Sequence, residues 1–212
     1  MALITTAVAQ TQSNFRIIDK PIPFDEERVL LSREYMHKHY GTEAQDITIT
    51  PKVIVLHYTA TTSFGSTWNY FSRTRIEPGR KELLHEGELN VSAHFLVDRD
   101  GTIYRLMPET WMARHCIGLN QVALGIENVG DAGHYPLTDQ QVNADAALVR
   151  YLAGKYAIAY LIGHNEYRRM ESTPLFKELV PGYRTAKSDP GEDFMRRVRA
   201  KLSDLKLKGP PL

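Results

Sequence analysis

An apolar run at residues 53–56 lies within the segment 52–60 and is rich in β-branched side chains. Apolar residues without alternation are typical of a strand buried on both faces, so the run predicts a central strand. The run ends abruptly in His57, followed by Tyr58 and a cluster of Thr and Ser residues. Polar side chains at the end of such a strand face the cleft where α/β proteins bind ligands. His57 is therefore a candidate site residue, with a core histidine bonded to a backbone carbonyl as the alternative.

Four further apolar segments predict strands, at residues 91–98, 102–107, 124–129 and 158–162. The dipeptide Asp100-Gly101 separates the first two segments and is typical of a hairpin turn. Glu127 lies among the apolar residues of the third segment, and the fourth is followed by Gly163 and His164. Two of the predicted buried strands therefore end in a histidine.

Helices are predicted from capping residues and apolar periodicity at residues 25–41, 66–75, 138–156 and from 189 onwards. Asp25 is a suitable N-cap for the first helix, and Gly41 suits its end. His37 and His39 fall in the last turn of that helix, where they favour the helix dipole, and we expect no metal there. Pro190 suits the first position of the last helix. Irregular structure is expected elsewhere, at residues 10–23, 77–90, 165–186 and 206–212.

Length and composition predict a single globular domain. The chain has 212 residues, of which 42% are hydrophobic and 24% are charged. We assign residues 46–206 to the domain, with an N-terminal arm and helix at 1–45 and a tail at 207–212. The net charge of +1 argues against nucleic acid as a partner. No apolar run is long enough to span a membrane, and Cys116 is the single cysteine, so no intrachain disulfide forms. A monomer is expected.

The segment Ala7-Val8-Ala9 has the small-x-small form of a signal-peptidase site. The apolar segment before it is short and lacks a basic start, so chance similarity is the alternative. With this segment, we expect the protein to act in the periplasm or cell envelope.

Three residues with metal-binding side chains are expected at the ends of predicted strands or at the start of a predicted helix. These residues are His57, His164 and Asp189. Two imidazoles and a carboxylate, with a fourth position left open, form the donor set of a catalytic zinc site. Asp189 precedes Pro190 at a predicted helix start, where an N-cap is the alternative role. The sequence has no HExxH pair, so spacing alone is a weak signal for the metal.

Several segments, taken in order, resemble those of zinc-dependent N-acetylmuramoyl-L-alanine amidases, a family that includes amidase-type phage lysozymes and peptidoglycan-recognition proteins. They are VIVLHYTA, VSAHFLVDRDGTIYRLMPE, ARHCIGLN, LGIEN, GHNEY and KSDPG. Together they extend over residues 53–194, and several ordered motifs are more specific than any single one. The resemblance implies an α/β fold, in which helices flank a mixed central β-sheet and zinc lies in a groove on one face.

The resemblance also implies roles for individual residues. By motif position, His57, His164 and Asp189 match the zinc ligands, Glu127 matches the general base, and Lys187 matches the lysine that stabilises the oxyanion. The implied reaction is hydrolysis of the amide between the lactyl group of N-acetylmuramic acid and L-alanine in peptidoglycan or muropeptides. An amide is a poor electrophile, so zinc must polarise its carbonyl, activate water, or both. A glutamate in apolar surroundings has a raised pKa that suits proton transfer, while an ion pair is the alternative reading of Glu127.

Substrate contacts are expected from His94, His115 and Asn128. Ala93 occupies the position next to His94 at which phage relatives have a tyrosine. Without that tyrosine, Glu127 is expected to carry more of the catalytic work. The interval between His164 and Asp189 is longer than in compact relatives, and its aromatic and basic residues form either a wall that reads the stem peptide or solvated surface. These residues are Tyr167, Arg168, Arg169, Tyr183 and Arg184.

Two other functions remain as alternatives. A cysteine peptidase of cell walls would use Cys116 as nucleophile with His94 or His115 as base. Adjacent His115 and Cys116 point to opposite faces of an extended segment, and no helix start follows to lower the pKa of the thiol. A non-catalytic wall-binding module of the same fold would lack a zinc ligand, whereas this sequence has all three.

Overall fold

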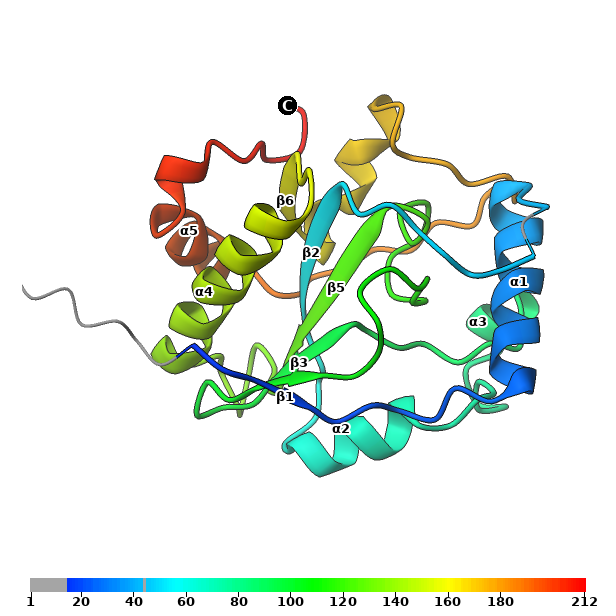
Figure 1. The fold of residues 1–212 in the computed structure, drawn as a ribbon, viewed down its shortest axis with the longest axis horizontal. Coiled ribbons are helices and arrows are strands. Elements are labelled where there is room, and N and C mark those ends of the chain that lie inside the picture. Colours follow the sequence, from blue (N-terminus) through cyan, green and yellow to red (C-terminus); the bar gives the residue numbers. More distant parts are fainter. Residues whose placement is uncertain (1–14, 44) are drawn as a thin grey trace, which may run out of the picture.

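Six strands form one mixed sheet in the computed structural model, which describes residues 15–43 and 45–212. In spatial order the strands are β1 (Ile17–Asp19), β4 (Ile103–Arg105), β3 (Phe95–Val97), β5 (Ala123–Asn128), β2 (Val53–Tyr58) and β6 (Tyr160–Gly163). Only β3 and β4 pair antiparallel, as expected for strands joined by the Asp100-Gly101 turn. The expected α/β fold with a mixed central sheet is confirmed, and Figure 1 shows its helices on the outside.

Strand β2 lies in the interior of the sheet, as its apolar run predicts. It pairs in parallel with β5 on one side and β6 on the other. Ile54 and Leu56 pack in one core on one face, whereas Val53 and Val55 pack in a second core on the opposite face. This alternation directs His57 towards the face of Val53 and Val55.

Two helices cover the face of Ile54 and Leu56. They are α4 (Asp139–Lys155) and α5 (Glu192–Ala200). Leu148 and Val149 of α4 and Val198 of α5 pack in the same core as these two strand residues. Thr138 and Gln141 form the capping box that the sequence predicts for α4. Each fully buried aliphatic side chain of this layer contributes about 1.5–3 kcal/mol to stability relative to an exposed one. This face of the sheet is therefore closed.

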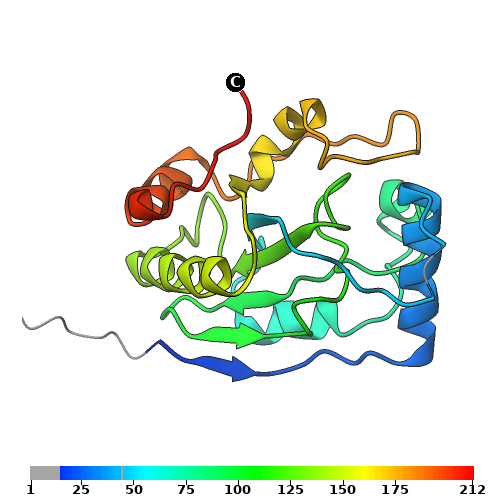
Figure 2. The same cartoon turned by 45° about the horizontal axis from the view of Figure 1, so that its top comes forward.

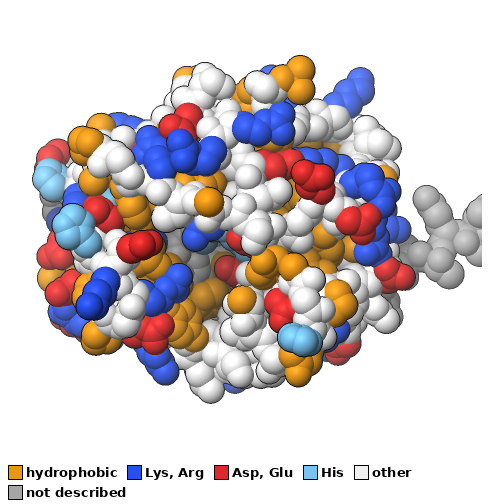
Figure 3. Space-filling model, turned by 180° about the vertical axis from the view of Figure 1, so that it is seen from behind, with side chains coloured by type: hydrophobic (Ala, Val, Ile, Leu, Met, Phe, Trp, Pro, Cys, Tyr) orange, Lys and Arg blue, Asp and Glu red, His pale blue; other side chains and the backbone are white. Residues whose placement is uncertain are grey.

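The other helices and an irregular segment cover the opposite face. They are α1 (Glu26–Tyr40), α2 (Phe64–Phe71), α3 (Lys81–His85), the 3-10 helix η1 (His164–Ser172) and the irregular residues 111–122, while the 3-10 helix η2 (Ser203–Leu205) follows α5. Figure 1 shows α1 at the opposite side of the molecule from α4 and α5. Seen from this second face, the centre of the molecule is hollowed, with cationic and anionic side chains around the hollow (Figure 3).

Several segments that were expected to be irregular have regular structure. Residues 77–90 include α3, and residues 165–186 begin with most of η1. The arm pairs with β4 through β1, at the outer edge of the sheet in Figure 2, and Lys208 in the tail forms a bridge with Tyr160. These pairings join segments far apart in the chain, so local composition carries no signal for them. Helix α5 begins at Glu192, and Pro190 precedes it instead of occupying its first position.

Asp25 and Gly41 cap α1 as expected, and His39 lies in its last turn, where other segments enclose it. Its side chain is fully buried, and its Nδ1 lies 2.8 Å from a carboxylate oxygen of Glu178. Its Nε2 lies 2.8 Å from the backbone oxygen of Glu86. The irregular residues 173–187 fold across the end of α1 and supply Glu178, which helix periodicity alone cannot indicate. None of the helices formed by the described residues has the length and apolar character needed to cross a membrane.

Asp145 of α4 is completely buried against the sheet and accepts a hydrogen bond of 2.9 Å from the Asn128 side chain. Burial raises the pKa of Asp145 to about 8. The folded protein therefore retains a proton there that the unfolded chain loses near pH 3.9, roughly the ordinary pKa of Asp. Stability from this proton is complete below that pH and is lost as the pH rises through about 8.

We therefore expect Asp145→Asn to flatten the pH dependence of stability. The wild type should lose up to about 1.4 kcal/mol per pH unit relative to this variant between pH 4 and pH 8. Urea denaturation of both proteins at several pH values measures the difference, in which the titrations of all other groups cancel. Parallel stability curves for the two proteins would contradict a protonated Asp145.

Candidate metal centre and active site

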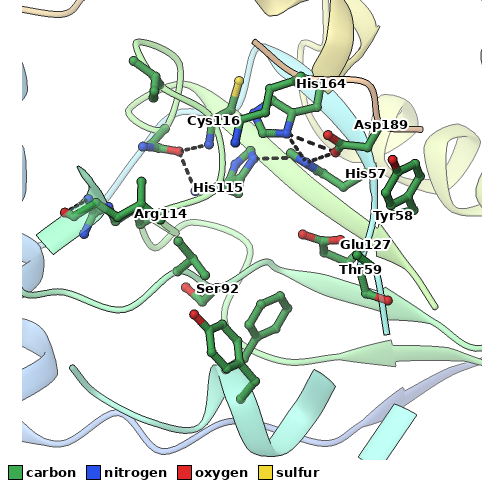
Figure 4. A pocket seen from close by; sticks show the side chains of 18 of the residues that line it. His57, Tyr58, Thr59, Ser92, Arg114, His115, Cys116, Glu127, His164 and Asp189 are labelled. Carbon is green, nitrogen blue, oxygen red and sulfur yellow. Dashed lines mark hydrogen bonds and ion pairs between the residues drawn. The ribbon is translucent and has the colours of Figure 1, made fainter. Parts of the chain in front are cut away.

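The three predicted ligands meet at one end of the central strands. His57 lies in β2 near its end, His164 follows β6 directly, and Asp189 precedes α5. The parallel register pairs Leu56 with Gly163, which places the two histidines level with each other. His57 Nδ1 lies 3.0 Å from His164 Nδ1, and Asp189 Oδ2 lies 3.1 Å and 3.0 Å from these two nitrogens. Figure 4 shows the three side chains pointing towards one another.

This donor set fits a small divalent metal. Ligand atoms at 2.0–2.1 Å from a tetrahedral zinc lie roughly 3.3 Å apart, close to the separations among these three atoms. Burial and the neighbouring His57 lower the pKa of His164 to about 4, which leaves its imidazole neutral. Burial alone would raise the pKa of Asp189, but the neighbouring His164 and His57 hold it well below its usual range. Both ligands are therefore in the unprotonated form that a metal requires.

His115 fixes the orientation and the tautomer of His57. Its Nε2 lies 3.3 Å from the backbone oxygen of Ala123, a contact that requires the proton on Nε2. Burial and the nearby His57 hold the pKa of His115 well below its usual range, so its Nδ1 is an acceptor. His57 Nε2 donates to that nitrogen over 3.0 Å, and His57 Nδ1 is left with a free lone pair for a metal.

A glycine makes room for this histidine. A side chain at Gly125 in β5 would meet the ring of His115 at 2.8–2.9 Å, too close for an ordinary contact. The ring lies on the sheet beside β2 for this reason. The glycine of the LGIEN segment therefore has a packing role, which depends on a contact with a residue outside its own strand.

The loops that carry His164 and Asp189 are bonded to each other. The Asn165 amide donates to the Asp189 backbone oxygen over 2.7 Å. Glu166 accepts a 2.8 Å hydrogen bond from the Gly163 amide and binds the Arg199 guanidinium through both carboxylate oxygens. Arg199 of α5 thus ties the turn after β6 to the last helix. These bonds fix the backbone of two ligands independently of any metal.

Glu127 lies beside the ligand cluster. The register of β2 and β5 pairs it with His57, and both side chains extend from the same face of the sheet (Figure 4). Its Oε2 is buried without a hydrogen-bond partner among the described residues. Burial raises the pKa of Glu127 to about 7, although His57, Lys187 and Arg80 each lower it. No ion pair holds Glu127 in the described structure, so the structural alternative of the sequence analysis has no support.

The cluster opens into a cavity of about 350 Å³. Its wall includes His57, Glu127, His164, Lys187 and Asp189, together with His115 as expected. Of the residues in the long interval, Tyr183 lines the cavity, whereas Arg168 and Arg169 are exposed and Tyr167 is a buried residue of η1. Arg80 and Tyr70 also line the cavity. Both residues lie in segments without a recognised motif, so no sequence signal pointed to them.

His94 and Asn128 lie outside this cavity, contrary to the expectation that they contact substrate. His94 is fully buried, its Nε2 donates to the Trp111 backbone oxygen over 2.8 Å, and its Nδ1 accepts from the Gly125 amide over 3.0 Å. Asn128 is also fully buried, and it donates to the His57 backbone oxygen and to Asp145. Side-chain alternation along β5 turns Asn128 towards α4. Both residues therefore support the site from within the core.

Cys116 is a poor nucleophile in this structure. Its side chain is 1% exposed, and burial raises the pKa of the thiol well above its usual range. The nearby imidazole of His115 is already committed to His57 and Ala123. A thiol that stays protonated next to a histidine that cannot accept its proton does not form a catalytic dyad.

Comparison with known proteins identifies the family. Residues 48–192, which include all three ligands, Glu127 and Lys187, match the family described as N-acetylmuramoyl-L-alanine amidase. The endolysin of Enterobacteria phage K11 is 31% identical over 86 residues, which are 38% of this chain and 57% of the endolysin. The chain thus spans little more than half the length of that curated relative.

Solved structures share the fold. The endolysin N-acetylmuramoyl-L-alanine amidase LysCS from Clostridium intestinale URNW is 25% identical with a TM-score of 0.51, over 91% of this chain and 97% of that one. An AmpD derivative is 23% identical with a TM-score of 0.55, over 87% of this chain and 93% of that one. With the family match, the sheet and the His57, His164 and Asp189 cluster, the chain belongs to the N-acetylmuramoyl-L-alanine amidase family.

Proposed function

We propose that this protein binds one Zn²⁺ through His57, His164 and Asp189 and hydrolyses the amide between the lactyl group of N-acetylmuramic acid and L-alanine in peptidoglycan. The observation that carries the proposal is the position of Glu127, a carboxyl with a pKa of about 7, beside an N, N, O ligand cluster in the same cavity. The family match supports the substrate class.

The residues divide the chemistry between them. When bound by His57, His164 and Asp189, Zn²⁺ supplies Lewis-acid polarisation for the amide carbonyl. Glu127 Oε2, which has no partner among the described residues, accepts a proton from the attacking water and passes it to the departing L-alanine amine. A pKa near 7 allows Glu127 to act as base and then as acid at neutral pH. Lys187, which lines the same cavity, places a positive charge near the oxyanion that forms from the carbonyl oxygen.

The products of peptidoglycan digestion test this function. An amidase releases stem peptides that begin with a free L-alanine amine and leaves glycan strands with intact lactyl carboxyl groups. Mass spectrometry of purified peptidoglycan before and after digestion distinguishes this cleavage from that of peptidases and glycosidases. Binding without any cleavage by the zinc-loaded protein would instead support the wall-binding module.

Alkylation separates this mechanism from cysteine catalysis. Treatment of the folded protein with iodoacetamide is expected to leave amidase activity unchanged within about twofold, because the Cys116 thiol is buried and protonated. The measurement is the initial rate before and after treatment, with the alkylated fraction determined by intact mass. Loss of activity in proportion to Cys116 alkylation would favour the peptidase.

We also place the protein in the periplasm or cell envelope, where polymeric peptidoglycan lies. The substrate class supports this location, and the segment Ala7-Val8-Ala9 that suggested export lies outside the described residues. Fractionation of the host cells followed by activity measurements on intact sacculi tests it. Activity confined to the cytosol, together with inability to cleave sacculi, would argue for recycled muropeptides as the substrate.

A further inference from the structure

Arg80 is a cation at the edge of the catalytic cavity. Among the described residues, no carboxylate lies within ion-pair distance of its guanidinium. Its Nη1 donates a 2.9 Å hydrogen bond to the Tyr70 hydroxyl, and the guanidinium lies 6.0 Å from the centre of the Tyr70 ring. No acceptor in the described structure bonds to its Nε or Nη2. The guanidinium therefore keeps donors for a ligand.

The backbone holds Arg80 in place. Its amide donates to Glu77, and its carbonyl oxygen accepts from Leu83 and Leu84 at the start of α3. With the Tyr70 hydrogen bond at the tip of the side chain, both ends of Arg80 are fixed. A guanidinium held in this way loses less conformational entropy when it binds a ligand than a free surface arginine does.

Arg80 lies where the catalytic cavity meets a second groove. Arg80, Lys187 and Leu83 line both, and the second groove, of about 370 Å³, also includes Lys81 and Glu82. Its three cations outnumber its one carboxylate. The positive charges of Lys187 and Arg80 both act electrostatically on Glu127, since each lowers the pKa of its carboxyl. A cationic path therefore leads out of the active site past Arg80.

The substrate has its charge on one side only. In the substrate the lactyl carboxyl forms part of the amide that the proposed reaction cleaves, and the N-acetylated glycan is otherwise uncharged. The free carboxylates lie on the stem peptide, beyond L-alanine. A cationic groove is therefore complementary to the peptide and offers nothing specific to the glycan.

We propose that Arg80 is a specificity-determining residue that binds a carboxylate of the stem peptide, so that the peptide leaves the active site along the groove of Arg80, Lys81 and Lys187. This assignment rests on the proposed amidase function and fixes the orientation of the substrate. The glycan then lies on the other side of the ligand cluster. Tyr70 positions the guanidinium, and Lys187 retains its role beside the scissile carbonyl.

Two matched substrates test the assignment, one with free stem carboxylates and one with the same groups as carboxamides. The wild type should prefer the free-carboxylate substrate by roughly 10- to 100-fold in kcat/KM. Arg80→Gln should abolish this preference by losing activity only on that substrate. Arg80→Lys should restore part of the preference, since it keeps the charge without the planar fork.

Arg73→Gln is the matched control. Arg73 lies 5.6 Å from the centre of the same Tyr70 ring, but it is exposed and lies outside both cavities. This variant should keep the full substrate preference. The assignment is overturned if Arg80→Gln retains the preference or loses activity equally on both substrates.

Binding of the free peptide gives a readout without turnover. A synthetic peptide that begins with L-alanine and has free carboxylates should bind the wild type and Arg73→Gln alike, and bind Arg80→Gln roughly 10-fold more weakly by calorimetry. If the wild type binds this peptide through Arg80 but cleaves neither substrate, the groove stands and the amidase function fails. If it cleaves both substrates equally well, the function stands and the Arg80 assignment fails.

Discussion

His57→Ala and Asp189→Ala are expected to abolish stoichiometric zinc binding and almost all amidase activity. Each change removes one of three ligand atoms that lie within 3.1 Å of one another. A metal ion contributes several kcal/mol of transition-state stabilisation, and each 1.36 kcal/mol is tenfold in rate, so the loss should exceed about 10³-fold. Elemental analysis of the dialysed proteins measures zinc per chain, and the initial rate on peptidoglycan measures activity.

His85→Ala is the control for this experiment. His85 lies in α3, and its side chain is 82% exposed. Zinc content and activity should therefore remain those of the wild type. Treatment of the wild type with a chelator should reproduce the loss, and added zinc should reverse it. One zinc per chain in both His57→Ala and Asp189→Ala would show that the metal lies elsewhere.

Glu127→Gln is expected to keep zinc and fold but to lower kcat by about 10²–10⁴-fold, the usual contribution of a general base. The amide is nearly isosteric with the carboxyl but cannot accept the proton from water. The pKa of about 7 also gives a direction for the wild type, because protonated Glu127 is inactive as a base. Wild-type kcat/KM should therefore fall as the pH drops below the pKa of Glu127.

Circular dichroism and zinc content establish that the Glu127→Gln protein is folded and loaded. Glu88→Gln provides the matched carboxylate-to-amide change at an exposed ion pair with Arg75, and it should retain wild-type activity. Activity of Glu127→Gln within about threefold of the wild type would remove Glu127 from the mechanism.

Local sequence determined the elements that build the site. The apolar run of β2 predicts a central strand, because only a strand buried on both faces has no reason to alternate. Capping residues predict the ends of α1 and the start of α4, because they satisfy backbone groups within a few residues. The strand ends then place His57 and His164 side by side once β2 and β6 pair in parallel. Asp189 was a candidate ligand because it precedes the predicted last helix, and the family resemblance added the roles of Glu127 and Lys187.

The tertiary structure decided which of the remaining polar residues face the cavity. His94 and His115 both suggested substrate contact, yet backbone groups enclose His94, whereas His115 bonds to His57 over the space left by Gly125. The role of Arg80 depends on Tyr70 and on the absence of a nearby carboxylate in the described structure. Such contacts join segments far apart in the chain, and their energy depends on burial and distance. Composition and periodicity record neither quantity, so only the folded chain could assign these residues.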